Sequence, residues 1–250
     1  MGAVPGSRVL SGSRVLSAAG HEPAGTGFDV EPFRSAGRRV VLRDVGRPLL
    51  VLGSTQAESA VDLRRTRIRG VEVVRRRSGG GAVLLLPGEQ VWADMWVPSG
   101  DPLWSVEPRL SAVLAGEWWA RALGPAPLEV HRGPSVSSRW STLVCFAGLG
   151  PGEVTRAGRK VVGLAQWRSR EGVLVQGCAY RRWDPRPIAD LLALSADARE
   201  SLAVYLAGAA AGIGDLGTSG HGVDAPFAGR VAHALVAALP DPDSWEVLTA

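Results

Sequence analysis

The chain has 250 residues, of which 46% are hydrophobic and 21% are charged, a composition that excludes a fully disordered chain and a fibrous protein. The length suffices for one large domain with its own hydrophobic core. The 28 basic and 24 acidic residues give a net charge of +4, which favours anionic partners such as nucleotides and phosphates. Because Cys145 and Cys178 are too few for the disulfide framework of a secreted domain, we expect a reducing, cytoplasmic location, with a single bridge left open.

The N-terminal half divides into a tail and a strand-rich segment. Residues 1–27 are rich in Gly, Ser, Ala and Pro, which predicts a poorly ordered tail ahead of a single domain over residues 28–250. Short runs of β-branched and aliphatic residues then favour strands. These runs are Leu49–Leu52, Val71–Arg75, Ala82–Leu86 and Val91–Val97. We expect the last three to be neighbouring strands of one sheet.

The second half alternates helical and strand patterns. Asp101-Pro102 opens a helix with apolar residues at three- and four-residue spacing, which ends before Gly124. Three more strands are predicted, over Thr142–Phe146, Lys160–Gln166 and Val173–Ala179. Helical spacing returns over Ile188–Leu206 and Phe227–Leu239. This order predicts a single domain of the α/β (α+β) class, with helices flanking a mixed sheet.

A glycine-rich segment between two predicted strands is the first candidate site. Arg75-Arg76-Arg77 and Ser78 precede three consecutive glycines, Gly79–Gly81. Glycine lets a backbone approach a ligand closely, and arginine supplies charge for a carboxylate or phosphate. A flexible hairpin turn with solvated arginines has the same composition, so the residues alone leave both interpretations open.

Lys160 and Cys145 are the other candidates. Lys160 stands where a predicted turn becomes a strand, so it is either an exposed turn lysine or a cation for a phosphate or carbonyl oxygen. Its surroundings lack the glycine spacing of a phosphate-binding P-loop. Cys145 follows an apolar run and is either a small buried side chain or a nucleophile that needs a nearby cation.

A metal site, a nucleic-acid site and a membrane-spanning helix are not expected. The histidines and cysteines lack the spacing of metal ligands. The basic run Arg64, Arg65, Arg67 and Arg69 lacks the interleaved aromatic residues of a nucleic-acid site. The longest nearly uncharged apolar stretch, Ser201–Ile213, is shorter than the about 18 residues that a membrane helix needs.

Taken together, the two glycine-containing segments resemble the catalytic domain shared by lipoate-protein ligase A, biotin protein ligase and the octanoyltransferases. The matching stretches are Leu52–Gln56, Val74–Val83 and Gly158–Arg168. The resemblance is strongest over residues 43–184 and implies a biotin/lipoate-ligase-like catalytic fold. Biotin ligation itself is not expected, because the loop of alternating Gly and Arg that is typical of biotin ligases is absent.

The resemblance implies a tunnel for lipoate or octanoate that the glycine loop and Lys160 enclose. In the ligases, ATP with Mg²⁺ activates the carboxylate as an acyl-adenylate. A lysine of a lipoyl domain, in a 2-oxoacid dehydrogenase or the glycine cleavage H protein, then displaces AMP. By position, Lys160 would hold the carbonyl and phosphate oxygens. The residues expected to bind the acyl-adenylate are Arg76, Ser78, Gly79, Gly80, Gly81, Ala82, Gly163 and Gln166.

The chain departs from the ligases at three places. Leu85-Leu86 stands where the family usually has His-Asp, and Gln176-Gly177 stands where it has His-Gly. The residues after Asp184 are expected to finish the first domain rather than to form the accessory domain of two-domain ligases. The resemblance therefore leaves room for a separate accessory subunit or for loss of the ATP half-reaction.

Cys145 carries the alternative function. Cys145-Phe146 precedes Lys160 by 15 positions, which resembles one class of octanoyltransferase whose thiol carries the acyl group. There Lys160 would favour the thiolate and stabilise the tetrahedral oxyanion, and no ATP would be consumed. We rank an ATP-dependent ligase first, a Cys145-dependent octanoyltransferase second, and a binding module that has lost the chemistry third.

Overall fold

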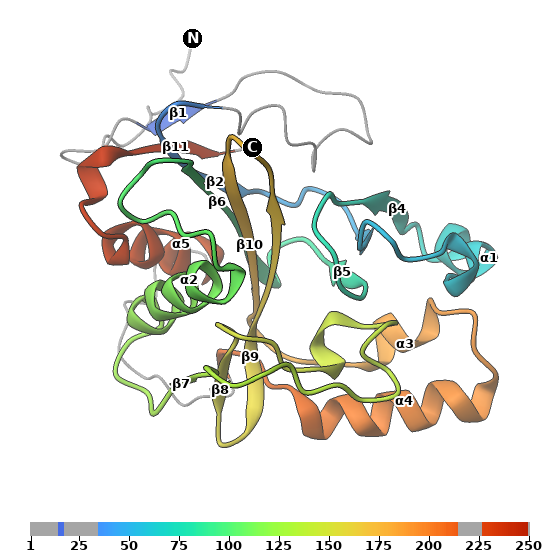
Figure 1. The fold of residues 1–250 in the computed structure, drawn as a ribbon. Helices are drawn as coiled ribbons and strands as arrows, with labels where there is room; N and C mark the ends of the chain where they lie inside the picture. The colour runs from blue at the N-terminus through green and yellow to red at the C-terminus, as the bar shows by residue number, and fades with distance from the viewer. Residues whose placement is uncertain (1–14, 18–34, 215–226, 250) are drawn as a thin grey trace, which may run out of the picture.

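The strand-favouring segments of the chain form two sheets rather than one. The computed structural model describes residues 15–17, 35–214 and 227–249 (Figure 1). Within these residues, eight strands form a larger sheet in the order β1-β11-β2-β6-β10-β9-β8-β7. Their bounds are β1 Val15–Ser17, β2 Arg38–Arg43, β6 Gln90–Pro98, β7 Glu129–Val130, β8 Val154–Arg156, β9 Arg159–Arg168, β10 Gly172–Tyr180 and β11 Trp245–Thr249.

The larger sheet is mixed, as the sequence predicts. Strand β11 runs parallel to both β1 and β2, and the other neighbouring strands are antiparallel. The strands predicted over Lys160–Gln166 and Val173–Ala179 are confirmed as the long hairpin β9–β10. Of the tail predicted over residues 1–27, Val15–Ser17 pair with β11, and the remainder lies outside the described residues.

A smaller sheet holds the strands on either side of the glycine segment. In the described part of the chain it has three strands, in the order β4-β3-β5, with bounds β3 Leu49–Leu52, β4 Glu72–Arg75 and β5 Val83–Leu85. The expectation that β4, β5 and β6 are neighbours in one sheet is wrong. Strand β3 lies between β4 and β5, because the segment that joins them crosses the end of β3 instead of forming a hairpin, and β6 belongs to the larger sheet.

Helices cover both faces of the larger sheet. Their bounds are α1 Leu63–Ile68, α2 Pro108–Ala122, α3 Arg186–Asp190, α4 Ala196–Ala209 and α5 Phe227–Ala238, with short 3₁₀ turns η2 Glu58–Ala60, η3 Cys145–Ala147 and η5 Pro242–Ser244. Helices α2 and α5 pack together on one face, whereas α3 and α4 lie on the other side, with the smaller sheet (Figure 1). None of the described helices has the length and apolar character needed to span a bilayer.

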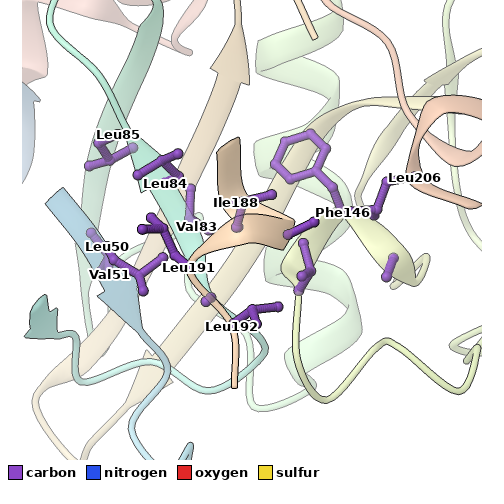
Figure 2. Close-up of a cluster of buried hydrophobic side chains, with 14 of the residues drawn as sticks. Leu50, Val51, Val83, Leu84, Leu85, Phe146, Ile188, Leu191, Leu192 and Leu206 are labelled. Atoms are coloured by element: carbon purple, nitrogen blue, oxygen red, sulfur yellow. The ribbon is translucent and has the colours of Figure 1, made fainter. Parts of the chain in front are cut away.

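Two hydrophobic cores lie on opposite faces of the central strands. Along β6, Ala93 and Met95 face the core beneath α2 and α5, and Trp92 faces the other core, because successive side chains of a strand alternate. The second core fills the space between the two sheets and helices α3 and α4 (Figure 2). Strands β6 and β10 are therefore buried on both faces.

Three predicted elements differ from the observed ones. The helix expected at Asp101 begins at Pro108, because the Asp101 carboxylate accepts a hydrogen bond from Leu103 N (2.8 Å) and holds a turn there. The predicted strand Thr142–Phe146 is a turn that leads into η3. The helix predicted over Ile188–Leu206 is two helices, and Ser195 caps the second one.

Candidate active site

The glycine segment is packed so closely that two positions tolerate no side chain. A Cβ on Gly53, at the end of β3, would lie 1.9 Å from the carbonyl oxygen of Gly80. A Cβ on Gly81 would lie 2.6 Å from the backbone nitrogen of Val144. Gly80 has a φ of +96°, which favours glycine on conformational grounds. Residues 76–82, which we call the glycine loop, therefore lie between the end of β3 and the turn before η3.

Arg76 shapes the glycine loop from inside. Its guanidinium is 2% exposed and donates hydrogen bonds to Ser78 Oγ (3.0 Å) and to the carbonyl oxygens of Val51 (3.2 Å), Gly79 (2.7 Å) and Gly81 (2.9 Å). Burial lowers the pKa of Arg76. The side chain that we expected at the acyl-adenylate is thus directed to the loop's own carbonyl groups.

The backbone N–H groups of the loop's three glycines are a separate feature of the site. Because Arg76 binds two of the loop's carbonyl groups, their orientation is fixed. Within the described residues, the N–H groups of Gly79, Gly80 and Gly81 have no hydrogen-bond partner. Adjacent N–H groups held in a fixed loop are suited to bind an oxyanion or a phosphate.

A buried polar network connects the loop to the larger sheet. Ser78 Oγ donates to Gln176 Oε1 (2.5 Å), and Gln176 Nε2 donates to Asp94 Oδ1 (2.9 Å). Arg43 Nε then forms an ion pair with Asp94 Oδ2 (2.5 Å). Sequence reasoning missed Asp94 and treated Gln176 only as a departure from the family. The single acidic residue within the apolar run Val91–Val97 was the signal that could have identified it.

Cys145 lies where the glycine loop meets strand β9. Its backbone N–H donates to Ala82 O (3.0 Å), so the first residue of η3 is fixed to the end of the loop. Its Sγ lies 3.3 Å from the position that a Cβ on Gly163 would occupy, and Lys160 Cε lies 3.3 Å from the same position. The thiol is free and partly exposed. Residues far apart in the sequence, including both predicted segments, therefore meet at Cys145.

Lys160 is buried, which rules out the exposed turn lysine considered for this position. Its ammonium is 3% exposed and donates to Cys145 O (2.7 Å), Gly148 O (3.0 Å) and Glu153 Oε1 (2.6 Å). It also lies 5.2 Å from the centroid of the Phe146 ring. All three N–H donors that we expected at substrate oxygens are therefore bound to protein acceptors.

Gln166 is not brought to this site. Its Nε2 donates to Pro108 O (2.9 Å), at the start of α2. It lies six positions along β9 from Lys160, which corresponds to roughly 20 Å. By contrast, Ala82 and Gly163 both contact the Cys145 segment.

Cys178 is a poor nucleophile in this position. It pairs with Gly163 across β9 and β10 and is 3% exposed. Burial, followed by the neighbouring Cys145 thiol, raises the pKa of Cys178, so its thiol stays protonated at neutral pH. Both cysteines are free, and the disulfide bridge that the sequence left open is not formed.

A cavity with both apolar and charged lining residues adjoins the aromatic side chains that pack on Phe146. Phe146 stacks on Trp183 (ring centroids 5.0 Å apart) and packs edge-on against Tyr180 (5.1 Å). Tyr180, Trp183 and Ile188 are among the residues that line a cavity of about 480 Å³. The tunnel for an acyl chain stays a prediction. The described residues contain no group of three acidic, His or Cys side chains that could hold a metal ion.

The fold and the site together define the class of protein. The profile of the lipoyl protein ligase A/B catalytic domain matches residues 37–212. The chain therefore belongs to this family, and the predicted resemblance is confirmed.

Two curated relatives make the comparison more specific. The octanoyltransferase LipM of Moorella thermoacetica is 35% identical over 136 residues, which cover 52% of this chain and 48% of the relative. The octanoyltransferase LipM of Clostridioides difficile is 30% identical over 122 residues, which cover 48% of this chain and 44% of the relative. The chain thus spans about half the length of the curated relatives it matches.

Solved structures share the fold at low sequence identity. The bi-partite lipoate protein ligase of Thermoplasma acidophilum, described with its E2 lipoyl domain, has a TM-score of 0.69 at 17% sequence identity. The match covers 95% of this chain and 86% of the matched chain. A lipoate-protein ligase A bound with ATP has a TM-score of 0.65 at 17% identity, covering 95% and 88%. These structures confirm the predicted fold class.

Proposed function

We propose that this protein is an octanoyltransferase in which the Cys145 thiol carries the octanoyl group as a thioester before a lysine of a lipoyl domain receives it. The observation that carries this proposal is the position of Cys145, between the glycine loop and Lys160. The curated relatives, both octanoyltransferases, support it. The ligase that the sequence ranks first becomes the second candidate.

In the first step, the sulfur of Cys145 attacks the carbonyl carbon of an octanoyl thioester on a carrier. A carbon–sulfur bond forms to Cys145, the bond to the carrier sulfur breaks, and the carrier leaves as a thiol with the proton that Cys145 gives up. The tetrahedral intermediate bears an oxyanion on the former carbonyl oxygen. The N–H groups of Gly79–Gly81 are the donors best suited to stabilise it.

In the second step, the amine of the acceptor lysine attacks the thioester. An amide bond forms, the bond to Cys145 Sγ breaks, and the amine's proton passes to the leaving sulfur. No nucleotide takes part. The acceptor in this proposal is the lipoyl domain of a 2-oxoacid dehydrogenase or the glycine cleavage H protein.

The remaining site residues support this chemistry indirectly. Arg76 and Ser78 hold the shape of the glycine loop. Lys160 holds the carbonyl groups of Cys145 and Gly148, at the two ends of η3. The missing side chain at Gly163 leaves space for the sulfur.

A lipoate-protein ligase is the second candidate, and the glycine loop favours it equally. Free N–H groups suit the phosphate of an acyl-adenylate as well as an oxyanion. ATP with Mg²⁺ would then be required, and Mg²⁺ is commonly bound through one or two carboxylates and the substrate's phosphates. In this reading Cys145 only packs against the cavity wall, and a separate accessory subunit would assist.

Intact-mass measurement separates the two candidates. We expect the purified protein, mixed with an octanoyl thioester donor without ATP, to gain one octanoyl group that hydroxylamine removes. Cys145→Ser should prevent the adduct, and Cys178→Ser is the matched control that should keep it. A protein that forms no adduct but joins octanoate to a lipoyl domain while consuming ATP would overturn the proposal in favour of the ligase.

A further inference from the structure

Glu153 is a buried carboxylate that the chemistry above does not use. It directly precedes β8, and its side chain is 4% exposed. Oε1 accepts hydrogen bonds from Lys160 Nζ (2.6 Å) and from the backbone N–H of Leu164 (3.0 Å). Oε2 accepts from the N–H of Gly150 (2.7 Å). The carboxylate thus connects strand β9 to the turn that follows η3.

The partner of Glu153 is the ammonium of Lys160, which donates to the backbone carbonyl of the proposed nucleophile, Cys145. An ammonium as buried as that of Lys160 is strongly disfavoured unless an opposite charge compensates it. Glu153 supplies that charge on one side of the ammonium. On the other side lie the carbonyl oxygens of Cys145 and Gly148. The groups therefore form a series from carboxylate to ammonium to the backbone of η3.

This series holds the backbone that carries the sulfur. The ammonium is shared among three acceptors, and loss of the carboxylate would leave it with two carbonyl groups and no counter-charge. If the ammonium of Lys160 moved, its hydrogen bond to the carbonyl oxygen of Cys145 would be lost. The hydrogen bond from Cys145 N–H to Ala82 O would remain to hold the Cys145 backbone.

We propose that Glu153 is a positioning residue for acyl transfer, which acts by holding Lys160 charged and directed at the backbone of Cys145. This inference rests on the proposed thioester chemistry at Cys145. In this proposal Glu153 acts through Lys160, so we expect it to affect the rate of transfer at the sulfur and to leave donor binding unchanged.

The test measures the rate at which Cys145 of the full chain gains an octanoyl group, by intact mass, over a range of concentrations of an octanoyl thioester donor. Glu153→Gln removes the charge and keeps the shape. We expect the maximal loading rate to fall by at least about ten-fold, because small misplacements of a reacting group are costly, with the half-saturating donor concentration unchanged. Glu153→Asp keeps the charge and should recover part of the rate.

Two further variants complete the experiment. Glu246→Gln is the control and should load at the unaltered rate, since Glu246 on β11 pairs with Arg39 on β2, near the opposite edge of the sheet from β8. Glu153→Gln combined with Lys160→Met removes both buried charges, so it tests the idea even where the single variant fails to fold. We expect the double variant to load as slowly as the single one.

The outcomes separate this inference from the proposed function. Loading at the unaltered rate in folded Glu153→Gln or in the double variant would overturn the role of Glu153 alone. A change confined to the half-saturating concentration would also overturn it, because it would indicate donor binding. If the unaltered protein forms no thioester, the proposed function fails, and the inference fails with it.

Discussion

Replacement of Gly81 by alanine tests whether close backbone packing places Cys145. A Cβ at this position would lie 2.6 Å from both N and C of Val144 and 2.8 Å from Cys145 N. Favourable contacts between such atoms begin at about 3.5 Å, so the Val144–Cys145 backbone would have to move by roughly 1 Å. The atoms that it meets all belong to the backbone, so no change of rotamer relieves the clash.

The expected effects follow from this displacement. Overpacking of a well-packed site costs about 1–3 kcal/mol, and each kcal/mol lowers the melting temperature of a domain of this size by about 2–4 °C. A displacement of about 1 Å at a reacting group reduces its rate by about 100-fold. We therefore expect Gly81→Ala to lower the melting temperature modestly and the octanoyl loading of Cys145 severely.

Calorimetry and time-resolved intact mass are the two measurements. Gly46→Ala is the matched control, because a Cβ on Gly46 meets no atom within 4 Å, the residue does not have a positive φ, and it lies outside the glycine loop. It should change neither quantity appreciably. Loading of Gly81→Ala at the rate of the unaltered protein would refute the reasoning that contact between the glycine loop and η3 places the sulfur.

Three further predictions concern buried charges and thiols. Arg76→Lys should lower the free energy of unfolding by about 2–5 kcal/mol in urea titrations, because one ammonium cannot replace the separate donors that bind the loop's carbonyl groups. Asp94→Asn should cost a similar amount by the same measurement, because it removes the buried negative charge that pairs with Arg43. Burial raises the pKa of both Cys178 and Tyr180, so the unfolded chain loses these protons first, and the free energy of unfolding should fall as pH rises above about 8.5 and again above about 10. A flat stability profile between pH 8 and 11 would contradict the last prediction.

The sequence predicts most strands but not their pairing. Runs of apolar residues are a local signal, and they identify β6, β9 and β10 because each strand is long; β6 and β10 are also buried on both faces. The order β4-β3-β5 is set by contacts between distant segments, which periodicity does not contain. The turn at Thr142–Phe146 has a strand-like composition, but hydrogen bonds from Leu143 N and Val144 N to Trp140 O hold it as a turn.

At the candidate site, the sequence identifies residues better than their roles. Glycine spacing indicated a close approach, and the structure places that approach at Gly53, Gly81 and the backbone of Val144. The predicted role of Arg76 at the acyl-adenylate stays a prediction; in the structure its guanidinium binds the loop's carbonyl groups, a contact that composition alone does not reveal. Glu153 was missed because its ion pair with Lys160 depends on the β8–β9 hairpin bringing the two together.

Most of the contacts that hold Cys145 are made by main-chain atoms, and the Lys160 side chain adds one. Its N–H is bound to the carbonyl of Ala82, its own carbonyl accepts from Lys160, and Gly81 packs against the peptide group that precedes it. Apart from Lys160 and its partner Glu153, the side chains around the thiol do not make these contacts. Natural or laboratory evolution can therefore vary the residues around the thiol, and with them the molecules accepted, without rebuilding the frame that presents the sulfur.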